Sequence, residues 1–411
     1  MKKATYLSAG LMLISAMSFA GAADSTAAKS PFTFSGYIDS YYFGNLNSPK
    51  SRDNLGISGT ARAFDQKAGT FGLGLVQTKF GYSNKKSDVV VDLTFGPNAD
   101  LGQYGNVVGP LGKGYGSTAL AIKQAYFDYK ATDKLTFTAG QFGTHIGYEV
   151  IDAPVNYNYS LSNLFNNGPF YHIGVKANYA VSDKFAIMAG VVNNVDNLYD
   201  NNRSKGIIAQ VFLSPKDKWT VYINYIGSNE ANPGNDTSAF YQLFDLTTGY
   251  QVTDKFFVGL NAAYGMQSGE YQGRSNVALV SGKDTTRSWS GAALYTNYAF
   301  TDKFGLGIRA EMFDNTSGVR GLTNITPGSG SVSSTANVNK YGGTSVSSIT
   351  LTANITLADG HLLLKPELRM DSFAKAADPL NTNNVQQFMD DKGLFSKTSQ
   401  TTIGLAAIYK F

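Results

Sequence analysis

One short phrase returns five times along this chain, and it limits the folds that are open to the sequence. Each copy ends in Asp-Lys and is followed at once by a run that begins with Leu, Phe or Trp and alternates apolar with polar residues. We expect the Asp to accept a hydrogen bond from a neighbouring backbone N–H and so to tighten a turn. The uneven spacing excludes a solenoid, which needs a fixed repeat, whereas short turns at one end and loops of varied length at the other are typical of outer-membrane β-barrels. The copies occupy residues 131–134, 181–184, 215–218, 252–255 and 300–303.

The runs between these turns have the two-residue period of β-strands. Trp219, Val221 and Ile223 share one face of such a run, and Thr220 and Tyr222 share the other. Many runs reach about ten residues, which exceeds the usual soluble strand and suits a tilted strand that crosses a bilayer. We expect strands at 32–43, 71–82, 88–96, 118–130, 135–143, 170–181, 185–193, 205–213, 219–227, 240–251, 256–266, 288–300, 304–314, 345–357, 361–371 and 398–411.

The sequence therefore predicts an all-β fold, a transmembrane antiparallel β-barrel of about 16 strands with short periplasmic turns, long outer loops and one inward-folded loop. A barrel of roughly 16–18 strands leaves a water-filled lumen. The last run ends with Ile403, Leu405, Ala407, Tyr409 and Phe411 on one face. A terminal Phe of this kind resembles the assembly signal of outer-membrane barrels, with an ordinary last strand as the alternative.

Charged residues divide these strands into two faces. In the run 361–371, Leu368 and Met370 lie on one face, and charges of alternating sign lie on the other. Because a Lys or Arg that faces lipid near the middle of the bilayer costs roughly 2–4 kcal/mol, we expect the charged face to line the lumen. The alternative is that the charges neutralise one another and only hydrate the wall. The expected pore-lining residues are Asp92, Lys176, Arg309, Glu311, Lys365, Glu367, Arg369 and Asp371.

The composition agrees with a barrel and excludes several other classes. The 411 residues include 44 Gly, 25 Tyr and 26 Phe, as expected for aromatic girdles, and no Cys, which excludes a disulfide scaffold and thiol chemistry. A formal net charge of +4 with dispersed basic residues argues against nucleic acid as a partner. Two lysines, a short apolar run and small residues predict a signal peptide at 1–22 and a barrel domain at 23–411, with a retained anchor helix as the alternative.

The segment from 144 to 169 is long, and it is rich in Asn, Tyr and Gly. A loop of this length without regular structure is usually functional or disordered, and its aromatic residues favour packing over disorder. We expect it to fold into the barrel and form a constriction, where Glu149 and Asp152 would face Lys176, Lys365 or Arg369. The alternative is an outward-facing loop that caps the barrel or covers a neighbouring subunit. The expected constriction residues are Glu149, Asp152, Asn156, Tyr157, Asn158 and Tyr159.

Other long loops, near 44–70, 97–117, 315–344 and 372–397, are rich in Ser, Gly and Asn and suit a solvated surface. The chain shows no sign of an enzyme. None of its three histidines, His145, His172 and His361, has a metal-ligand spacing with another, and neither a G-x-S-x-G elbow nor a P-loop occurs. We expect no catalytic residue, no metal and no cofactor, and His172 is expected to be a hydrogen-bonded wall or loop-anchoring residue.

Several motifs between about 120 and 210 carry a family resemblance. They are Lys123-Gln124-Ala125-Tyr126, Ala139-Gly140-Gln141-Phe142, Gly147-Tyr148-Glu149, Asn156-Tyr157-Asn158-Tyr159-Ser160, the run from Gly168 to Val175, Val192-Asn193-Asn194-Val195-Asp196 and the polar stretch from Asp200 to Lys205. With these motifs the chain resembles the putative β-barrel porin-2 (OmpL-like) family. The sequence departs from that pattern at Leu161, where an Arg is common, and at Val195, where a Trp is common. The resemblance implies an outer-membrane pore and leaves its ion preference open.

Two functions follow from these observations. The first is an outer-membrane porin, a water-filled channel for passive diffusion of small hydrophilic solutes and ions, with selectivity set by width and charge. The second is a non-conducting barrel whose surface loops act in adhesion or partner binding. The expected partners are the lipid bilayer of the outer membrane and small solutes, and a homo-oligomer such as a trimer is left open.

Overall fold

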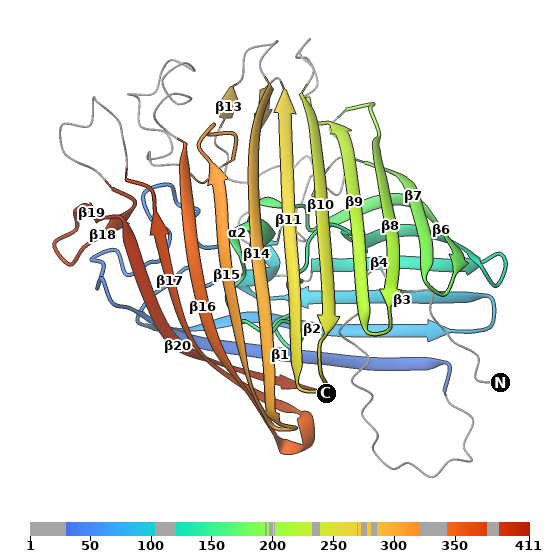
Figure 1. Cartoon of the computed structure of the whole chain (residues 1–411), viewed down its shortest axis with the longest axis horizontal. Coiled ribbons are helices and arrows are strands. Elements are labelled where there is room, and N and C mark those ends of the chain that lie inside the picture. The colour runs from blue at the N-terminus through green and yellow to red at the C-terminus, as the bar shows by residue number, and fades with distance from the viewer. Residues whose placement is uncertain are drawn as a thin grey trace.

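The computed structural model describes residues 30–102, 121–193, 195–196, 200, 202–231, 239–268, 270–272, 278–280, 286–320, 322, 343–375 and 386–411. Within these residues the chain forms one closed barrel in which each strand pairs antiparallel with the next and β20 pairs with β1 (Figure 1). The predicted signal peptide at 1–22 and most of the predicted loop 97–117 lie outside the described residues. The described part contains no helix that is long and apolar enough to cross a membrane.

The sixteen strands of the barrel agree with the predicted ones in number and order. They are β1 (Phe32–Asn45), β2 (Thr70–Ser83), β3 (Ser87–Phe95), β4 (Ala121–Lys130), β5 (Leu135–Gly143), β6 (Tyr171–Ser182), β7 (Phe185–Val192), β8 (Gly206–Lys216), β9 (Trp219–Asn229), β10 (Phe240–Gln251), β11 (Phe256–Ser268), β14 (Thr286–Thr301), β15 (Phe304–Asn315), β16 (Thr344–Leu357), β17 (Leu362–Phe373) and β20 (Ser399–Lys410).

Short elements lie between the long strands. Two small two-stranded sheets, β12 (Glu270–Gln272) with β13 (Ala278–Val280) and β18 (Phe388–Met389) with β19 (Phe395–Lys397), belong to loops. The helical pieces are α1 (Pro97–Leu101), α2 (Asn163–Asn167) and the turn η2 (Ala358–Gly360). Strand β8 continues past the predicted end at 213 because a register shift between Leu213 and Lys216 accommodates Pro215, which has no N–H for the ladder.

The repeated turns are tightened by a different residue from the predicted one. In three of them the hydroxyl of the Thr before the Asp accepts the backbone N–H of the Lys after it. Thr132 accepts from Lys134 at 3.1 Å, Thr253 from Lys255 at 3.3 Å and Thr301 from Lys303 at 3.2 Å. The prediction that the Asp supplies this acceptor was wrong, since a Thr hydroxyl forms the same kind of turn.

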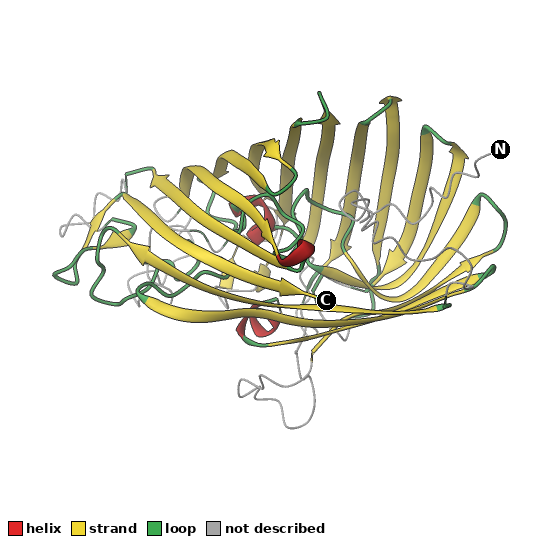
Figure 2. Ribbon diagram, turned by 90° about the horizontal axis from the view of Figure 1, so that it is seen from below, coloured by secondary structure: helices red, strands yellow, loops and turns green. Residues whose placement is uncertain are grey.

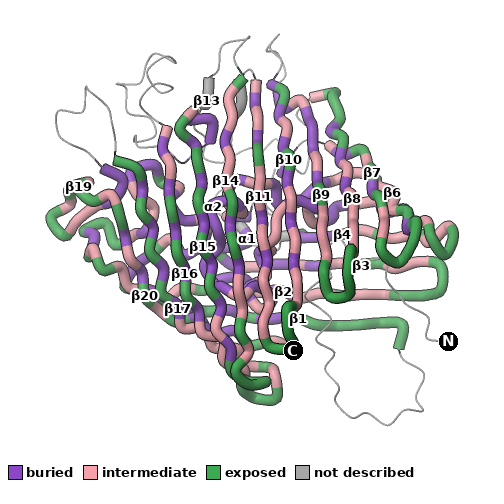
Figure 3. The backbone as a smooth tube through the Cα atoms, in the orientation of Figure 1, coloured by how far each residue is buried: buried purple, intermediate pink, exposed green. Residues whose placement is uncertain are grey.

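The strands present apolar side chains outward and polar side chains inward, as the alternation predicted. On β15, Met312 is 70 % exposed, whereas its neighbour Glu311 is buried and Arg309 is 0 % exposed. On β17, Leu368 and Met370 are exposed on the outer face. Figure 3 shows this alternation of buried and exposed positions along β15, β16 and β17.

One loop that was expected on the solvated surface folds into the barrel instead. Between β1 and β2, the side chain of Arg62 is buried, and it pairs with Asp65 at 2.5 Å and with Asp371 of β17 at 2.9 Å. Phe64 is buried as well and contacts the rings of Phe165 and Phe170. Loop 46–69 therefore packs against both the wall and the loop between β5 and β6. Figure 2 shows loop segments and a short helix in the space enclosed by the strands.

Candidate functional site

The loop between β5 and β6, residues 144–170, begins at a fixed point on the wall. The backbone N–H of Thr144 donates to the carbonyl of Phe170 at 3.0 Å, and the Thr144 hydroxyl lies 3.0 Å from Nε2 of His172 on β6. The next residue, His145, donates from Nε2 to the Tyr225 carbonyl of β9 at 3.0 Å. Burial lowers the pKa of His145 to about 3, so this imidazole is neutral at ordinary pH. Both histidines thus hold the start of the loop.

The first arm of the loop then lies on β9, β10 and β11. Asp245 of β10 accepts the backbone N–H of Gly147 at 3.0 Å, and it also accepts amide N–H groups of Asn224 at 2.8 Å and Asn261 at 2.5 Å. These three wall residues were not among the predicted site residues. Their signal in the sequence is a polar side chain on the inward face of a strand, which by itself does not distinguish a loop contact from a hydrated wall.

The ring of Tyr148 occupies room that a glycine leaves. A Cβ on Gly259 of β11 would lie 2.8 Å from the Tyr148 ring, closer than side-chain contacts allow. The ring also stacks on Tyr295 of β14, with centroids 4.1 Å apart. A missing side chain in the wall and an aromatic residue in the loop therefore form one packed unit.

The two acidic residues of the loop pair with bases on opposite sides of the lumen. Glu149 and Arg309 of β15 form a buried ion pair at 2.5 Å. Asp152 pairs with Lys123 of β4 at 2.5 Å, and Lys123 lies 3.2 Å from Asp92 of β3. The prediction that Glu149 and Asp152 face Lys176, Lys365 or Arg369 was wrong. The loop crosses the lumen along a path that its sequence does not specify.

The charged wall of β15 and β17 instead binds the backbone of the loop. Glu367 accepts the N–H of Tyr159 at 2.7 Å and that of Ser160 at 3.1 Å. Glu311 accepts the N–H of Asn163 at 3.0 Å and that of Leu164 at 2.8 Å, so its negative charge meets the N-terminal end of α2.

The basic residues of β17 complete this surface. Arg369 donates to the Leu161 carbonyl at 2.7 Å and to Asp371 at 2.8 Å, and Lys365 donates to the Asn156 carbonyl. The Lys176 ammonium of β6 lies 4.4 Å from the centre of the Phe142 ring, away from the loop acids. Glu311, Glu367, Lys365 and Arg369 on β15 and β17 therefore contact the backbone of the loop rather than bulk water.

The remaining predicted constriction residues pack against the wall. The Asn158 amide donates to the Thr352 hydroxyl of β16 at 2.8 Å. Tyr159 stacks on Phe43 of β1, with ring centroids 5.7 Å apart, and its hydroxyl donates to Asp39 at 3.1 Å. The ring of Tyr157 lies 5.4 Å from Phe257 of β11.

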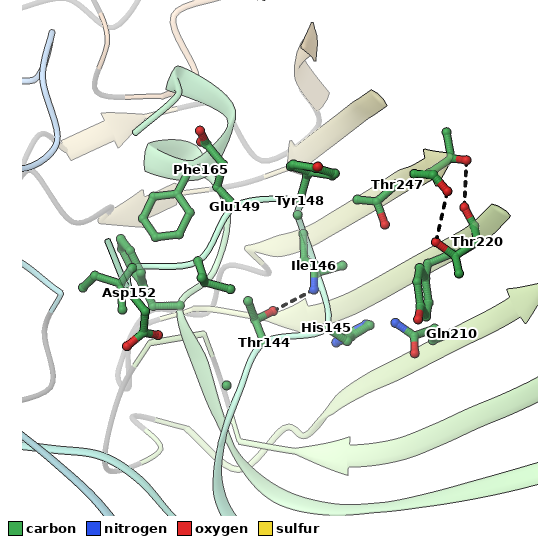
Figure 4. Close-up of a pocket in the computed structure, with 18 of the residues that line it drawn as sticks. Thr144, His145, Ile146, Tyr148, Glu149, Asp152, Phe165, Gln210, Thr220 and Thr247 are labelled. Carbon is green, nitrogen blue, oxygen red and sulfur yellow. Dashed lines mark hydrogen bonds between the residues drawn. The ribbon is translucent and has the colours of Figure 1, made fainter. Parts of the chain in front are cut away.

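A cavity of about 150 Å³ lies beside the loop. Loop residues 144–152, Tyr157, Phe165 and Phe170 form one side of it, and residues of β4, β8, β9, β10 and β11 form the other. Figure 4 shows Gln210, Thr220 and Thr247 on the strand side of this cavity, with Asp152 and Phe165 on the loop side. The loop thus covers the β15–β17 wall and leaves space toward β8–β11.

A closed sixteen-strand barrel with an apolar outer face, a charged lumen and a loop folded inside it defines the class of outer-membrane porins. The chain belongs to the family described as "Putative beta-barrel porin-2, OmpL-like", whose profile matches residues 31–411. It is thus a protein of the bacterial outer membrane. No curated protein matches the sequence.

Solved structures of other porins share this fold at low sequence identity. The outer membrane channel DcaP of Acinetobacter baumannii is 12% identical with a TM-score of 0.56, and the match covers 92% of this chain and 97% of that chain. An anion-selective porin from Comamonas acidovorans is 10% identical with a TM-score of 0.56, over 93% and 100% of the two chains. OprB of Pseudomonas putida is 12% identical with a TM-score of 0.53, over 93% and 94%. At such identities the likeness concerns the fold alone.

Proposed function

We propose that this porin is a passive diffusion channel for small hydrophilic solutes and ions, and that the loop 144–170 is its constriction. The observation that carries the proposal is the path of the loop. It starts on β9–β11, crosses to Arg309 of β15 and continues along β16 and β17, so that any solute in this part of the lumen passes beside it.

The contacts of the loop support weak ion selectivity. Glu149 and Asp152, the acids that would attract cations, are each bound to a base, and Glu311 and Glu367 are bound to backbone N–H groups. A charge that is already paired at close range presents a smaller field to a passing ion than an unpaired one. We therefore expect width, rather than charge, to decide what passes.

Recording from the purified protein in a planar bilayer tests the proposal. A diffusion channel gives discrete conductance steps that scale with salt concentration, and liposomes that contain it swell in small sugars. A protein that inserts, as judged by heat-modifiable gel mobility, and gives neither steps nor swelling contradicts the proposal and favours the non-conducting barrel with binding loops. A homo-oligomer such as a trimer is left open, and the mass of the protein in detergent, measured by light scattering, tests it separately.

A further inference from the structure

The cavity beside the loop has the chemistry of a binding site rather than of a hydrated gap. We propose that it binds a neutral, hydroxyl-rich ring solute of monosaccharide size; this inference rests on the proposed channel function and names the solute class that the channel takes.

Aromatic rings supply the flat apolar surfaces that one face of a sugar ring needs. The Phe257 ring of β11 stands beside Gly249, where a Cβ would lie 2.9 Å from that ring, so the wall is thinned at this point. The Tyr157 ring of the loop lies 5.4 Å from Phe257 and faces the same space. Pockets lined mainly by such rings with a few placed polar groups are the usual form of a small-molecule site. The rings that line the cavity are Tyr148, Tyr157, Phe165, Phe170, Tyr222 and Phe257.

Hydroxyl and amide groups line the same cavity. Thr220 and Thr247 line the strand side, and a Thr hydroxyl can both donate and accept. Gln210 also lines it, and only one of the two N–H groups of its amide is needed for the bond to Asn224 at 2.8 Å. Groups that donate and accept match sugar hydroxyls, which do both, better than they match an ion.

The charged side chains at the cavity already have ion-pair partners. The Lys123 ammonium contacts Asp152 at 2.5 Å and Asp92 at 3.2 Å. One oxygen of Glu149 is bound to Arg309, and the other accepts the N–H of Ser162 at 2.8 Å. Among the described residues that line the cavity, the charged side chains are Lys123, Glu149 and Asp152. Each already has a partner of opposite charge, so an anionic or cationic solute meets no free counter-charge there. A neutral solute needs none.

The size agrees with a single ring. A cavity needs at least roughly 10–15 Å³ of space to hold one water molecule. The 150 Å³ observed exceed that minimum about tenfold, so the cavity has room for a small organic solute rather than for one water alone. A single sugar ring is a solute of this order of size, whereas a chain of several rings is not.

Saturation-transfer difference NMR on the folded protein in dodecyl-dimethylamine oxide, a detergent without a sugar headgroup, tests the proposal directly. D-Glucose is the probe, and D-gluconate and D-glucosamine serve as anionic and cationic analogues of similar size. We expect glucose to bind and each charged analogue to bind at least about tenfold more weakly, which corresponds to about 1.4 kcal/mol. Gluconate or glucosamine binding as tightly as glucose overturns the proposal, and so does no glucose binding by the folded wild-type barrel.

Substitutions at the cavity locate the bound sugar. Phe257→Leu and Thr247→Val are each expected to weaken glucose binding about tenfold, whereas Phe244→Leu, on the exposed outer face of β10, leaves it unchanged. Thr247→Val keeps the shape of the side chain and therefore answers the objection that Phe257→Leu merely disturbs folding. Unchanged affinity in both cavity variants places the sugar elsewhere and overturns the proposal.

Conductance separates this inference from the channel proposal. A protein that binds glucose and does not conduct refutes the channel alone. A protein that conducts and does not bind glucose refutes the binding site alone. In a channel that does both, added glucose is expected to reduce the ion current in a saturable way, and Phe257→Leu shifts the half-blocking concentration upward about tenfold.

Discussion

Glu149 in the loop and Arg309 on β15, 160 residues apart in the sequence, form a buried ion pair at 2.5 Å across the interior of the barrel. The same guanidinium donates to the Ser160 carbonyl at 2.6 Å, further along the loop. One wall residue thus holds two positions of the loop.

Glu149→Gln is expected to loosen the loop. The substitution leaves the buried Arg309 guanidinium without its ion-pair partner, and breaking a buried pair in this way costs on the order of 3–5 kcal/mol. Single-channel recordings should show more flicker, and in the double variant with Asp152→Asn the ion preference should shift toward anions. Asp254→Asn is the matched control, because its pair with Lys218 at 2.7 Å lies in an exposed turn. Equal noise in both variants contradicts the role of the pair.

Deletion of residues 155–166 is expected to raise the single-channel conductance. This segment covers β15–β17, and its removal opens Glu311, Lys365, Glu367 and Arg369 to water. Because these charges have both signs, the wider channel should remain weakly selective. Reversal potentials in a salt gradient measure the selectivity. A channel that inserts normally with an unchanged conductance would show that the loop is not the constriction.

Gly259→Val is expected to displace the Tyr148 ring and with it the first arm of the loop. Overpacking of this kind typically costs about 1–3 kcal/mol, and here the added Cβ would lie 2.8 Å from the ring. The variant should flicker as Glu149→Gln does. Gly44→Ala is the control, since the nearest atom to its Cβ is a carbonyl oxygen at 3.8 Å.

The two faces of the wall can be tested with single cysteines, because the chain has none of its own. A spin label at Ile308, on the outer face of β15, should be reached by a lipid-soluble quencher. A label at Thr247, beside the cavity, should be reached by an aqueous one. The opposite pattern indicates a shifted register, because a slip of one residue exchanges the faces.

A contact between two outer loops is expected to depend on pH. Burial raises the pKa of Glu230 to about 7 from an ordinary value of 4.5, and the Val195 N–H donates to its carboxyl at 3.3 Å. Since the folded-state pKa is raised, the docked form is favoured below pH 4.5, and this advantage is lost as the pH rises to about 7. Amide exchange at Val195, corrected for its intrinsic rate, should accelerate over this range. Glu230→Gln should remove the pH dependence, and a wild-type profile in that variant refutes the assignment.

Much of the barrel could be predicted from the sequence, because its determinants are local. The faces of β15 follow from alternation alone, and Ile308 lies outward and Arg309 inward as predicted. Charge reinforces the alternation, since the same side chain is costly in lipid and inexpensive in water. The number of strands could also be predicted, because the repeated turn sequences mark where one strand ends and the next begins.

The partners inside the barrel could not be predicted. Lys176 was as plausible a partner for Glu149 as Arg309, because both have inward positions on the wall, and only the folded loop distinguishes them. The inward path of loop 46–69, which buries Arg62 against Asp371, was missed altogether, since its Ser- and Gly-rich sequence is equally typical of a solvated loop.

The sequence by itself determined the membrane strands, their order and the face that each side chain presents, because alternation and the cost of charge in lipid act on neighbouring residues. The tertiary structure decided which loops enter the lumen, which charges neutralise one another and where a cavity remains. These outcomes depend on contacts between residues more than a hundred positions apart, such as Glu149 and Arg309. The same wall charges can be satisfied by a loop along more than one path, and the path is decided by packing, such as that of the Tyr148 ring against Gly259.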